Sequence, residues 1–559
     1  MSGAAAAPVV CDVLVAGGGP CGLMLANELG RRGISLLLVD EKPDTAFNPQ
    51  ANATQARTME HFRRLGFADE IRALGLPPDY PTDIAYFTRY AGHELARFRL
   101  PSAQAAKARA RESGSSWSTP ELPHRVSQKY VEAVLRRHAE ALPGVSLRYG
   151  WRLEDFNDRG DGVTAMVAPA AGGAPVAVQA RYLVGADGAR SLVRRRLGIR
   201  YGGETGVQRD FMGGRMYALY LQAPDFYAAT GHAPAWMNVA FNPERRAFMA
   251  AVDGAGEFAF HTQLQPGEDE GRLGEADALA LFHATAGAAI PARILSRGSW
   301  TAGHALVADS FGRGRVLLGG DAVHLFTPTG GLGYNTAIED AVNLGWKLAA
   351  VLRGQAAPAL LDSYEAERRP LALRNTGYAR GFADSLGLFR PDPAIERADA
   401  AGAAARARAG AYLGDHARRE FNIPGITFGG RYDGSPAIIA DGSTPPADAA
   451  NVYVPTACPG GRPPHLWLAD GGSLFDRFGF DWTLLALRDD DGAFAAAMQA
   501  AAARAGIGLV VVRPDSPAAR DLYAADHVLI RPDHMVAWRG AAGDAAAILR
   551  HLLGYGAAS

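Results

Sequence analysis

A glycine-rich turn near the start of the chain constrains the fold more than any other feature. A strand-like run over 9–15 leads into the turn Gly17-Gly18-Gly19-Pro20-Cys21-Gly22, and a helical pattern over 21–32 follows it. A second strand, predicted over 35–39, ends in Asp40. This order of strand, glycine turn, helix and strand predicts a βαβ unit carrying the G-x-G-x-x-G pattern.

Each glycine of this pattern has a physical role. Gly17 permits the tight turn, Gly19 lets a pyrophosphate approach the backbone, and Gly22 lets the helix pack on the strand. Asp40 follows Gly17 by 23 positions and can accept hydrogen bonds from a ribose. A plain glycine turn is the alternative, but the strand–turn–helix frame with its acidic residue favours dinucleotide binding.

Two further motifs lie far along the chain from the first. The segment 185–188, Gly-Ala-Asp-Gly, follows a predicted strand and precedes Arg190 and Ser191. Gly320-Asp321 follows another strand-like run, and the glycine-rich segment 328–335 then opens a long helical pattern. For Asp187 the alternative role is a capping turn ahead of the 191–197 helix.

Together the three motifs resemble those of the class A flavoprotein monooxygenases. The resemblance is to the branch that contains phenol hydroxylase, 2,4-dichlorophenol hydroxylase and 2-hydroxybiphenyl monooxygenase. It implies FAD as the cofactor, NADPH or NADH as a transient reductant, O2 and a small aromatic substrate, with hydroxylation through a flavin C4a-hydroperoxide. No second G-x-G-x-x-G follows a predicted strand, which agrees with a reductant that binds transiently without a dinucleotide-binding domain of its own.

On this resemblance we expect Asp40 to bind the adenosine ribose and Asp321 to lie near the ribityl chain. The amides of 328–335 and the helix dipole can stabilise negative charge on the reduced flavin. The full set of expected cofactor-binding residues is Gly17, Gly19, Pro20, Cys21, Gly22, Asp40, Glu41, Arg57, Gln128, Asp187, Gly320, Asp321, Pro328, Gly330, Gly331, Leu332, Gly333, Tyr334 and Asn335.

The predicted fold class is α/β, with a Rossmann-like FAD domain interrupted by a mixed β-sheet substrate domain. A C-terminal thioredoxin-like α/β domain follows, and it has no C-x-x-C, so we expect a structural or dimerising role there. No flavin motif lies beyond Asn335, so deletion of the C-terminal domain should leave a flavin-binding core. The expected boundaries are 1–82, 124–200 and 301–385 for the FAD domain, 83–123 and 201–300 for the substrate domain, 386–424 for a helical connector and 425–559 for the thioredoxin-like domain. Residues 101–123 are predicted to form a surface loop.

The substrate pocket is predicted to be apolar and uncharged. Benzoate-hydroxylating relatives bind a carboxylate through Ser and Arg on a strand that matches 248–252, where this chain has Phe-Met-Ala-Ala-Val. We therefore expect a phenolic substrate without a carboxylate, contacted by Asn52, Arg215, Trp236, Met237 and Phe248. If aromatic acids were preferred, Arg215 or another nearby arginine would be the anchor.

Two positions in the segment 50–57 differ from the relatives, and one of them bears on the catalytic base. Relatives usually carry an arginine where this chain has Gln50, and the biphenyl branch has a histidine that deprotonates the phenol where this chain has Asn52. An amide cannot act as a base at neutral pH, although it can orient a hydroxyl. Asn52 and His261 are the candidate catalytic residues, and a structural role for His261 is the alternative.

Composition excludes several other classes of function. Lys and Arg total 57 against 58 Asp and Glu, so no field favours nucleic acid or an anionic membrane as a partner. Three scattered cysteines indicate neither a disulfide framework nor a zinc site, and no metal is expected. Without a leader or an apolar run of 18 residues, we expect a cytoplasmic protein, and we expect a homodimer.

Two other hypotheses remain at this stage. One is a flavin-dependent reductase or dehydrogenase acting on an apolar substrate, which would turn over without incorporating oxygen. The other is a non-catalytic flavoprotein that binds a small molecule, which the missing base at Asn52 allows. The sequence names neither the substrate nor the position hydroxylated, and it does not choose between NADH and NADPH.

Overall fold

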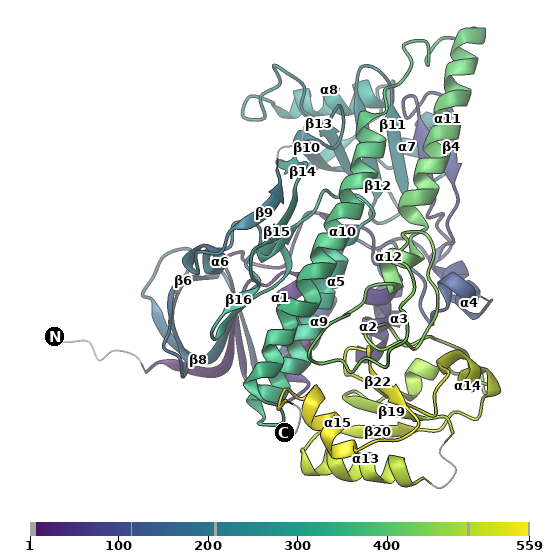
Figure 1. The fold of residues 1–559 in the computed structure, drawn as a ribbon. Coiled ribbons are helices and arrows are strands. Elements are labelled where there is room, and N and C mark those ends of the chain that lie inside the picture. Colours follow the sequence, from purple (N-terminus) through teal and green to yellow (C-terminus); the bar gives the residue numbers. More distant parts are fainter. Residues whose placement is uncertain (1–6, 113, 206–208, 489–491, 557–559) are drawn as a thin grey trace, which may run out of the picture.

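The computed structural model describes residues 7–112, 114–205, 209–488 and 492–556 (Figure 1). Residues 1–6, part of the stretch on which the absence of a leader was argued, lie outside the described residues. The predicted fold class is confirmed: a large sheet with parallel central strands, a mixed sheet inserted into it and a smaller C-terminal α/β module.

The large sheet has five parallel neighbours at its centre. Strands β1, β2, β5, β8 and β17 run in the order β17-β8-β1-β2-β5, and every pair among these neighbours is parallel. A β6–β7 hairpin extends β8 in the antiparallel sense, and β16 pairs antiparallel with β17. The bounds are β1 Val9–Ala16, β2 Leu36–Asp40, β5 Val145–Tyr149, β6 Trp151–Asp158, β7 Val163–Pro169, β8 Val176–Gly185, β16 Gly312–Arg313 and β17 Val316–Leu318.

Helices pack on this sheet and bury its central strands. Helix α1 packs against both α5 and α9. Helices cover both faces of a parallel sheet, so its central strands are continuous apolar runs in the sequence. In agreement with this rule, residues 13–16 and 36–39 are all buried. The bounds are α1 Pro20–Gly30, α2 Ala56–Leu65, α3 Ala68–Arg72, α5 Gln128–Glu140, α6 Leu192–Arg196 and α9 Leu332–Leu352.

The inserted sheet has seven strands in the order β14-β10-β13-β12-β11-β3-β4. A hairpin around Gly92 forms its β3–β4 edge, and β3 joins β11 in the one parallel pairing that the described strands of this sheet make. Helices α7 and α8 cover one face, where Phe226 contacts Phe258 and Phe282 contacts Phe260. The bounds are β3 Ile84–Phe87, β4 Glu94–Phe98, β10 Gly214–Gln222, β11 Met237–Phe241, β12 Arg246–Ala251, β13 Glu257–Gln263, β14 Arg293–Ala302, α7 Phe226–Thr230 and α8 Glu275–Ala286.

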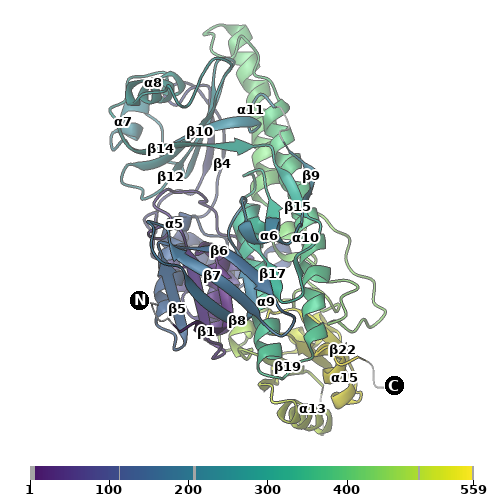
Figure 2. The same cartoon turned by 90° about the vertical axis from the view of Figure 1, so that its left-hand side faces the viewer.

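Two long helices connect the layers of the molecule. Figures 1 and 2 show α10 running from beside the C-terminal module toward the inserted sheet, with α11 packed beside its upper part. Helix α11 also packs on β4 and β3, at the edge of the inserted sheet. The bounds are α10 Asp362–Leu388, α11 Ala400–Phe421 and α12 Pro424–Phe428.

The C-terminal module is a four-stranded mixed sheet, β20-β19-β21-β22, with three helices. Over 464–468 the chain forms no strand, only an isolated bridge between Trp467 and Ser473. The bounds are β19 Trp482–Ala486, β20 Leu509–Val512, β21 His527–Ile530, β22 Val536–Gly540, α13 Ala493–Arg504, α14 Pro517–Tyr523 and α15 Ala545–Leu552.

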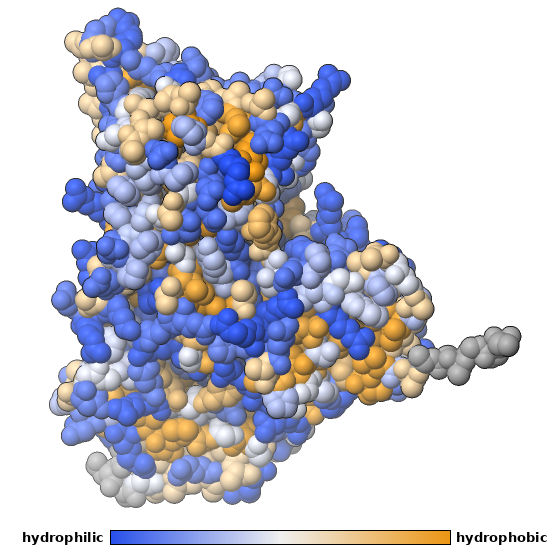
Figure 3. Space-filling view, turned by 180° about the vertical axis from the view of Figure 1, so that it is seen from behind, coloured by the Kyte–Doolittle hydropathy of each residue, from blue (hydrophilic) through white to orange (hydrophobic). Residues whose placement is uncertain are grey.

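The segment predicted as a loop over 101–123 contains helix α4, Ala103–Glu112. A small three-stranded sheet, β18-β15-β9, lies between the large and the inserted sheets. Its bounds are β9 Tyr201–Glu204, β15 Ala305–Ala308 and β18 His324–Leu325. No helix in the part of the chain that the structure describes is long and apolar enough to cross a membrane. On the face opposite that of Figure 1, apolar patches alternate with hydrophilic side chains (Figure 3).

Candidate functional site

The three separated motifs meet at one edge of the large sheet. Strands β1, β8 and β17 are parallel neighbours, so the turns that follow them lie side by side. The Ala186 amide donates to the Ala16 carbonyl at 2.7 Å, and the Gly319 amide donates to the Gly185 carbonyl at 3.0 Å. Ligands of open α/β sheets bind at this carboxyl edge, which therefore gives the motifs a common site.

The glycines of the first turn have the packing that their predicted roles require. Gly17 has φ +109°, and a Cβ there would lie 2.1 Å from the Ala186 carbonyl oxygen. A Cβ on Gly22 would lie 2.0 Å from the Gly17 carbonyl oxygen. No atom of the described structure lies within 4 Å of the Cβ position of Gly19, so its backbone is open to a ligand at the N-terminus of α1.

Asp40 lies beside the same turn. Its Oδ2 accepts from the Gly18 amide at 2.6 Å, and its Oδ1 accepts from the Lys42 amide at 2.8 Å. A carboxylate has about four lone-pair sites, so capacity remains for a ribose hydroxyl. The neighbouring Glu41 is exposed.

Asp321 and Cys21 join the first and third motifs. Cys21, in the first turn of α1 after Pro20, is buried against the third motif, because a Cβ on Gly319 would lie 3.0 Å from its Sγ. Asp321 is solvent-exposed as a residue, yet burial raises the pKa of its carboxyl. That combination is expected of a carboxylate recessed among protein groups and open on one side, as a ribityl contact requires.

Asp187 caps helix α6, the alternative role that the sequence left open. Its Oδ1 accepts from the Ser191 hydroxyl and its Oδ2 from the Val193 amide at 3.1 Å, while burial raises the pKa of its carboxyl. Arg194 of this helix stacks over Tyr201, whose hydroxyl donates to the Asp321 carbonyl. The second motif thus also supports the third.

The loop before α2 is tied to the N-terminus of α9. The Asn335 Oδ1 accepts from the Gln55 amide at 2.8 Å, and the Asn335 Nδ2 donates to the Ala53 carbonyl at 2.9 Å. Gly330 and Gly331 have φ of +63° and +65°, which glycine adopts without strain. The expected residues Pro328, Leu332 and Gly333 belong to this turn and the first residues of α9.

Four polar groups around this loop are buried and have no hydrogen-bond partner of good geometry in the described structure, although Thr54 and Tyr334 lie close enough to affect one another. The four groups are Asn52 Oδ1, Thr54 Oγ1, Ser127 Oγ and Tyr334 OH. The next residue, Gln128, begins α5, and its amide donates to the Ala51 carbonyl at 2.7 Å. Buried polar groups are normally satisfied, so four such atoms beside the nucleotide motifs fit a bound polar cofactor such as FAD.

A buried network that the sequence analysis missed holds the third motif in place. Asp340 of α9 accepts from the Gly320 amide at 3.1 Å, lies 2.7 Å from His324 Nε2, and pairs with Arg368 Nε at 2.8 Å. Burial alone would raise the pKa of the Asp340 carboxyl, but His324 and Arg368 lower it. A charged residue inside an otherwise apolar helical run was the signal that could have identified it.

Arg57 does not point toward the nucleotide motifs. Its Nη1 pairs with Glu60 at 3.0 Å, and its Nη2 donates to the Asp533 and His534 carbonyls at 2.7 and 2.9 Å. It also lines a hollow of only about 30 Å³ next to the C-terminal module. The sequence placed Arg57 by its nearness to the loop, but α2 turns the side chain away from the site.

Aromatic and sulfur side chains form a wall on the inserted sheet. Met237, Phe248, His261 and Trp300 come from β11, β12, β13 and β14, and each is half-buried. Phe248 and His261 are register partners, and β10 lies between β13 and β14. Phe248 stacks on His261 with a centroid distance of 4.6 Å. The same face carries Tyr220, whose hydroxyl accepts from Lys129 Nζ of α5 at 2.5 Å. The wall therefore faces the module that carries the nucleotide motifs.

The geometry of His261 argues against the base that we expected. Its Nδ1 accepts from the Trp300 indole N–H at 3.1 Å, so the proton of the neutral ring lies on Nε2. The one lone pair of the imidazole is therefore occupied, and burial lowers the pKa of the ring to about 4. A structural role in the wall accounts for this residue.

Arg215 lies outside the wall. It pairs with Glu270 at 2.6 Å on the surface, and both side chains are well exposed. Trp236 is buried immediately before β11, and the guanidinium of Arg125 lies over its ring, 4.5 Å from the centroid. Arg125 was missed because a lone arginine in a loop carries no sequence signal.

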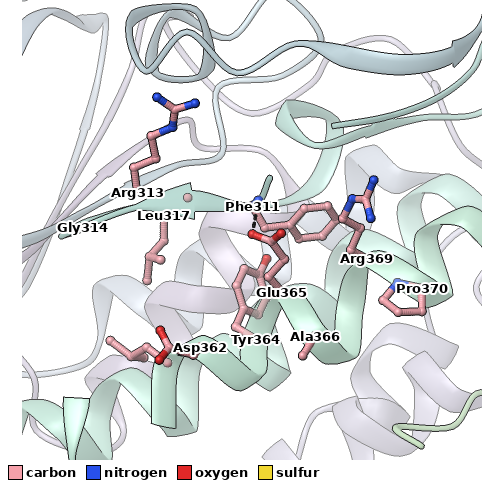
Figure 4. A pocket seen from close by; sticks show the side chains of 12 residues that line it. Phe311, Arg313, Gly314, Leu317, Asp362, Tyr364, Glu365, Ala366, Arg369 and Pro370 are labelled. Atoms are coloured by element: carbon pink, nitrogen blue, oxygen red, sulfur yellow. Dashed lines mark hydrogen bonds between the residues drawn. The ribbon is translucent and has the colours of Figure 1, made fainter. Parts of the chain in front are cut away.

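One hollow of the described structure is lined by none of these residues. Its volume is about 460 Å³, and it lies between the β16–β17 hairpin and α10 (Figure 4). Glu365 points toward the hairpin there and accepts from the Phe311 amide at 2.9 Å, while the Tyr364 hydroxyl donates to the Leu318 carbonyl. Among the described residues, no group of three His, Cys, Asp or Glu side chains could hold a metal ion.

Comparison with known proteins agrees with this geometry. Residues 10–378 match the FAD binding domain family, and residues 456–555 match the family described as aromatic-ring hydroxylase, C-terminal. Aklavinone 12-hydroxylase RdmE from Streptomyces purpurascens is 32% identical, with 97% of this chain and 98% of that protein covered. Phenol 2-monooxygenase from Pseudomonas sp. (strain EST1001) is 29% identical, with 95% and 90% covered. The structure of RebC with bound 7-carboxy-K252c superposes with a TM-score of 0.87 at 34% identity, covering 98% of this chain and 100% of that one.

Proposed function

The chain belongs to the FAD-dependent aromatic-ring hydroxylases, and from this premise we propose that it uses NADH or NADPH with O2 to hydroxylate a fused-ring phenol. When bound, FAD supplies the redox chemistry: two electrons from the nicotinamide reach O2, one oxygen atom enters the ring and the other leaves as water. The residues that we propose to hold FAD are Gly17, Gly19, Pro20, Cys21, Gly22, Asp40, Glu41, Gln128, Gly320, Asp321, Pro328, Gly330, Gly331, Leu332, Gly333, Tyr334 and Asn335.

The width of the aromatic wall carries the proposal of a fused-ring substrate. Met237, Phe248, His261 and Trp300 lie on β11, β12, β13 and β14, and with the intervening β10 the wall spans five adjacent strands. Strands are spaced about 4.8 Å apart, so four steps make the wall about 19 Å wide, more than twice the width of one benzene ring. The relatives are named with different compounds, phenol, aklavinone and 7-carboxy-K252c, so their names do not indicate the size of this chain's substrate. We infer that size from the wall.

The side chains of this wall bind and orient rather than transfer protons. His261 has no free lone pair, and Asn52 is an amide whose Oδ1 can accept from a substrate hydroxyl. Phe248 presents a ring face for offset stacking, which is the favoured arrangement of aromatic pairs. Burial of the ring system against the wall also excludes water from the reacting edge.

Oxygen incorporation tests the proposal. Purified protein with FAD is supplied with NADH or NADPH, 18O2 and either phenol, 1-naphthol or 1-anthrol. We expect nicotinamide oxidation to rise with ring number and one 18O atom to appear in the product. Phe248→Ala should raise KM for the fused-ring compounds by about tenfold with unchanged FAD content, whereas Arg215→Gln should not. Turnover without 18O in the product would instead favour a reductase or dehydrogenase.

A further inference from the structure

A buried arginine lies between the cofactor loop and the aromatic wall. Arg125 is 5% exposed, and its Nη1 is buried without a partner. No hydrogen bond or ion pair to its guanidinium occurs within residues 7–112, 114–205, 209–488 and 492–556. Arginine remains protonated in proteins, so the folded chain holds a buried cation without a direct ion-pair partner.

Its surroundings consist of hydrogen-bond donors and aromatic rings. The guanidinium lies 4.5 Å from the Trp236 ring centroid and 5.9 Å from that of Phe421. The buried indole N–H of Trp236 also lacks an acceptor. Two adjacent side chains thus offer only unsatisfied donors, and an acceptor that carries negative charge is the group that would satisfy both.

The nearest carboxylate is already engaged elsewhere. Glu420 raises the pKa of Arg125, but burial has the larger effect and lowers that pKa to about 10, so the guanidinium stays charged at neutral pH. The Glu420 Oε1 accepts from the Gly330 amide at 2.8 Å, and its Oε2 lies 2.8 Å from His416 Nε2. Glu420 therefore supports the turn before α9 and forms no ion pair with Arg125.

The position of Arg125 relates it to both halves of the site. In the antiparallel bridge between Thr54 and His124, Arg125 comes opposite Ala53, which contacts the Gly331 turn. On its other side, Trp236 directly precedes Met237 of the wall. A group bound by Arg125 would thus lie beside the Gly331 turn at the N-terminus of α9 and near the end of β11 that Trp236 precedes.

We propose that Arg125 is a specificity-determining residue that binds an oxyanion of the aromatic substrate, a carboxylate or a phenolate. This inference rests on the proposed function, and it replaces the expectation of an uncharged pocket. A phenolate held in this way would need no protein base, which accounts for an amide at Asn52 and an engaged lone pair on His261. The apolar strand 248–252 remains the wall for the rings.

Ligand binding without turnover tests this inference. The change in flavin absorbance is measured as oxidised protein with FAD is titrated with 1-naphthol, 1-hydroxy-2-naphthoate or 2-nitro-1-naphthol, without a reductant. We expect the wild type to bind at least one of the two anions tenfold or more tightly than 1-naphthol. The naphthoate distinguishes a carboxylate site, and the acidic nitronaphthol a phenolate site.

Variants separate recognition from folding. Arg125→Gln should bind all three compounds within about twofold of one another, Arg125→Lys should keep part of the preference, and Arg215→Gln should keep all of it. Arg125 has only ring contacts and no hydrogen-bond or ion-pair partner to lose, and its burial is costly, so Arg125→Gln should also melt at or above the wild-type temperature. An unchanged anion preference in Arg125→Gln, or a wild type without any preference, would overturn the proposal. So would loss of FAD or a lower melting temperature with the preference intact. Because binding is measured without a reductant, a failure of the protein to hydroxylate these compounds would not change the outcome of this test.

Discussion

At the residue scale, glycine positions in the first turn do two different things. Gly22 is required by the fold, because a Cβ would lie 2.0 Å from the Gly17 carbonyl oxygen, whereas the space around Gly19 is empty. The same motif therefore contains one structural glycine and one that serves only a ligand. The sequence pattern alone does not separate these roles, since both positions are simply glycine.

This difference predicts opposite outcomes for two alanine substitutions. Gly22→Ala should lower the free energy of unfolding by several kcal/mol, because backbone must move to relieve the overlap. Gly19→Ala should leave unfolding within about 0.5 kcal/mol but weaken FAD binding about tenfold or more, because the methyl group occupies the approach of the pyrophosphate. Urea unfolding of the FAD-free protein and a fluorescence titration with FAD measure the two effects. Equal destabilisation by both substitutions would contradict this division.

His261 gives a prediction for acid stability. Burial lowers the pKa of the folded-state ring to about 4, below the ordinary value of about 6.5 that applies in the unfolded chain. Between these values the unfolded chain binds the proton and the folded protein does not, so stability falls as the pH drops below about 6.5. Above that pH both states are neutral, and the residue contributes no pH dependence.

His261→Phe should remove this part of the acid sensitivity while retaining a ring to stack on Phe248. Between pH 6.5 and 5.5 the free energy of unfolding should fall by about 1 kcal/mol less in the variant than in the wild type. Any difference in the free energy of unfolding above pH 7 would reflect the lost hydrogen bond from Trp300. Urea unfolding at several pH values measures both slopes. Parallel slopes for the two proteins would show that the ring titrates normally in the folded state.

At the element scale, strongly apolar segments were predicted well and weakly apolar ones were not. The strands that became β1, β2, β8 and β17 were identified, because buried parallel strands are continuous apolar runs. Helix α4 was taken for a loop, since only Ala106 and Ala110 are buried and small side chains give little hydrophobic periodicity. The edge strand β6 was missed because its exposed face is polar.

Element placement also decided which candidate side chains share a site. Arg57 and Gln55 are two positions apart, yet Gln55 donates to the Gly330 carbonyl at 2.8 Å and Arg57 binds the C-terminal module. The start of α2 separates them, because successive residues of a helix point in different directions. Spacing along the chain could not reveal this.

At the scale of the whole molecule, buried ion pairs join the C-terminal module to the rest of the chain. Arg531 pairs with Glu367 of α10 at 2.7 Å, and Arg462 pairs with Glu60 of α2, with all four side chains at most 1% exposed. Burial alone would raise the pKa of the Glu367 carboxyl, but Arg531 and Lys347 hold it well below its usual range. Deletion of 425–559 would leave Glu367 and Glu60 without these partners. These buried pairs argue against our expectation that a flavin-binding core survives that deletion, and the expectation stays a prediction.

Arg531→Met should then lower the free energy of unfolding by roughly 3–5 kcal/mol, because it leaves the buried Glu367 carboxylate with too little positive charge beside it. The exposed pair Arg477–Asp470 provides the control, and Arg477→Ala should cost less than about 1 kcal/mol. Chemical denaturation with FAD absorbance as a second probe measures both. If residues 1–424 fold and bind FAD alone, and Arg531→Met is neutral, the modules are independent.

The expected homodimer stays a prediction, which light scattering on the purified protein would test.

The sequence by itself determined the cofactor class, because the dinucleotide motif depends on local backbone geometry that a few residues specify. It also determined the α/β architecture, since apolar periodicity reflects burial directly. The convergence of the three motifs, the direction of Arg57 and the bond that engages His261 were decided only by the tertiary structure. The same holds for Arg125, whose lack of a partner is a property of everything packed around it. Contacts between residues far apart in the chain arise from strand order and helix packing, which no short stretch of sequence encodes.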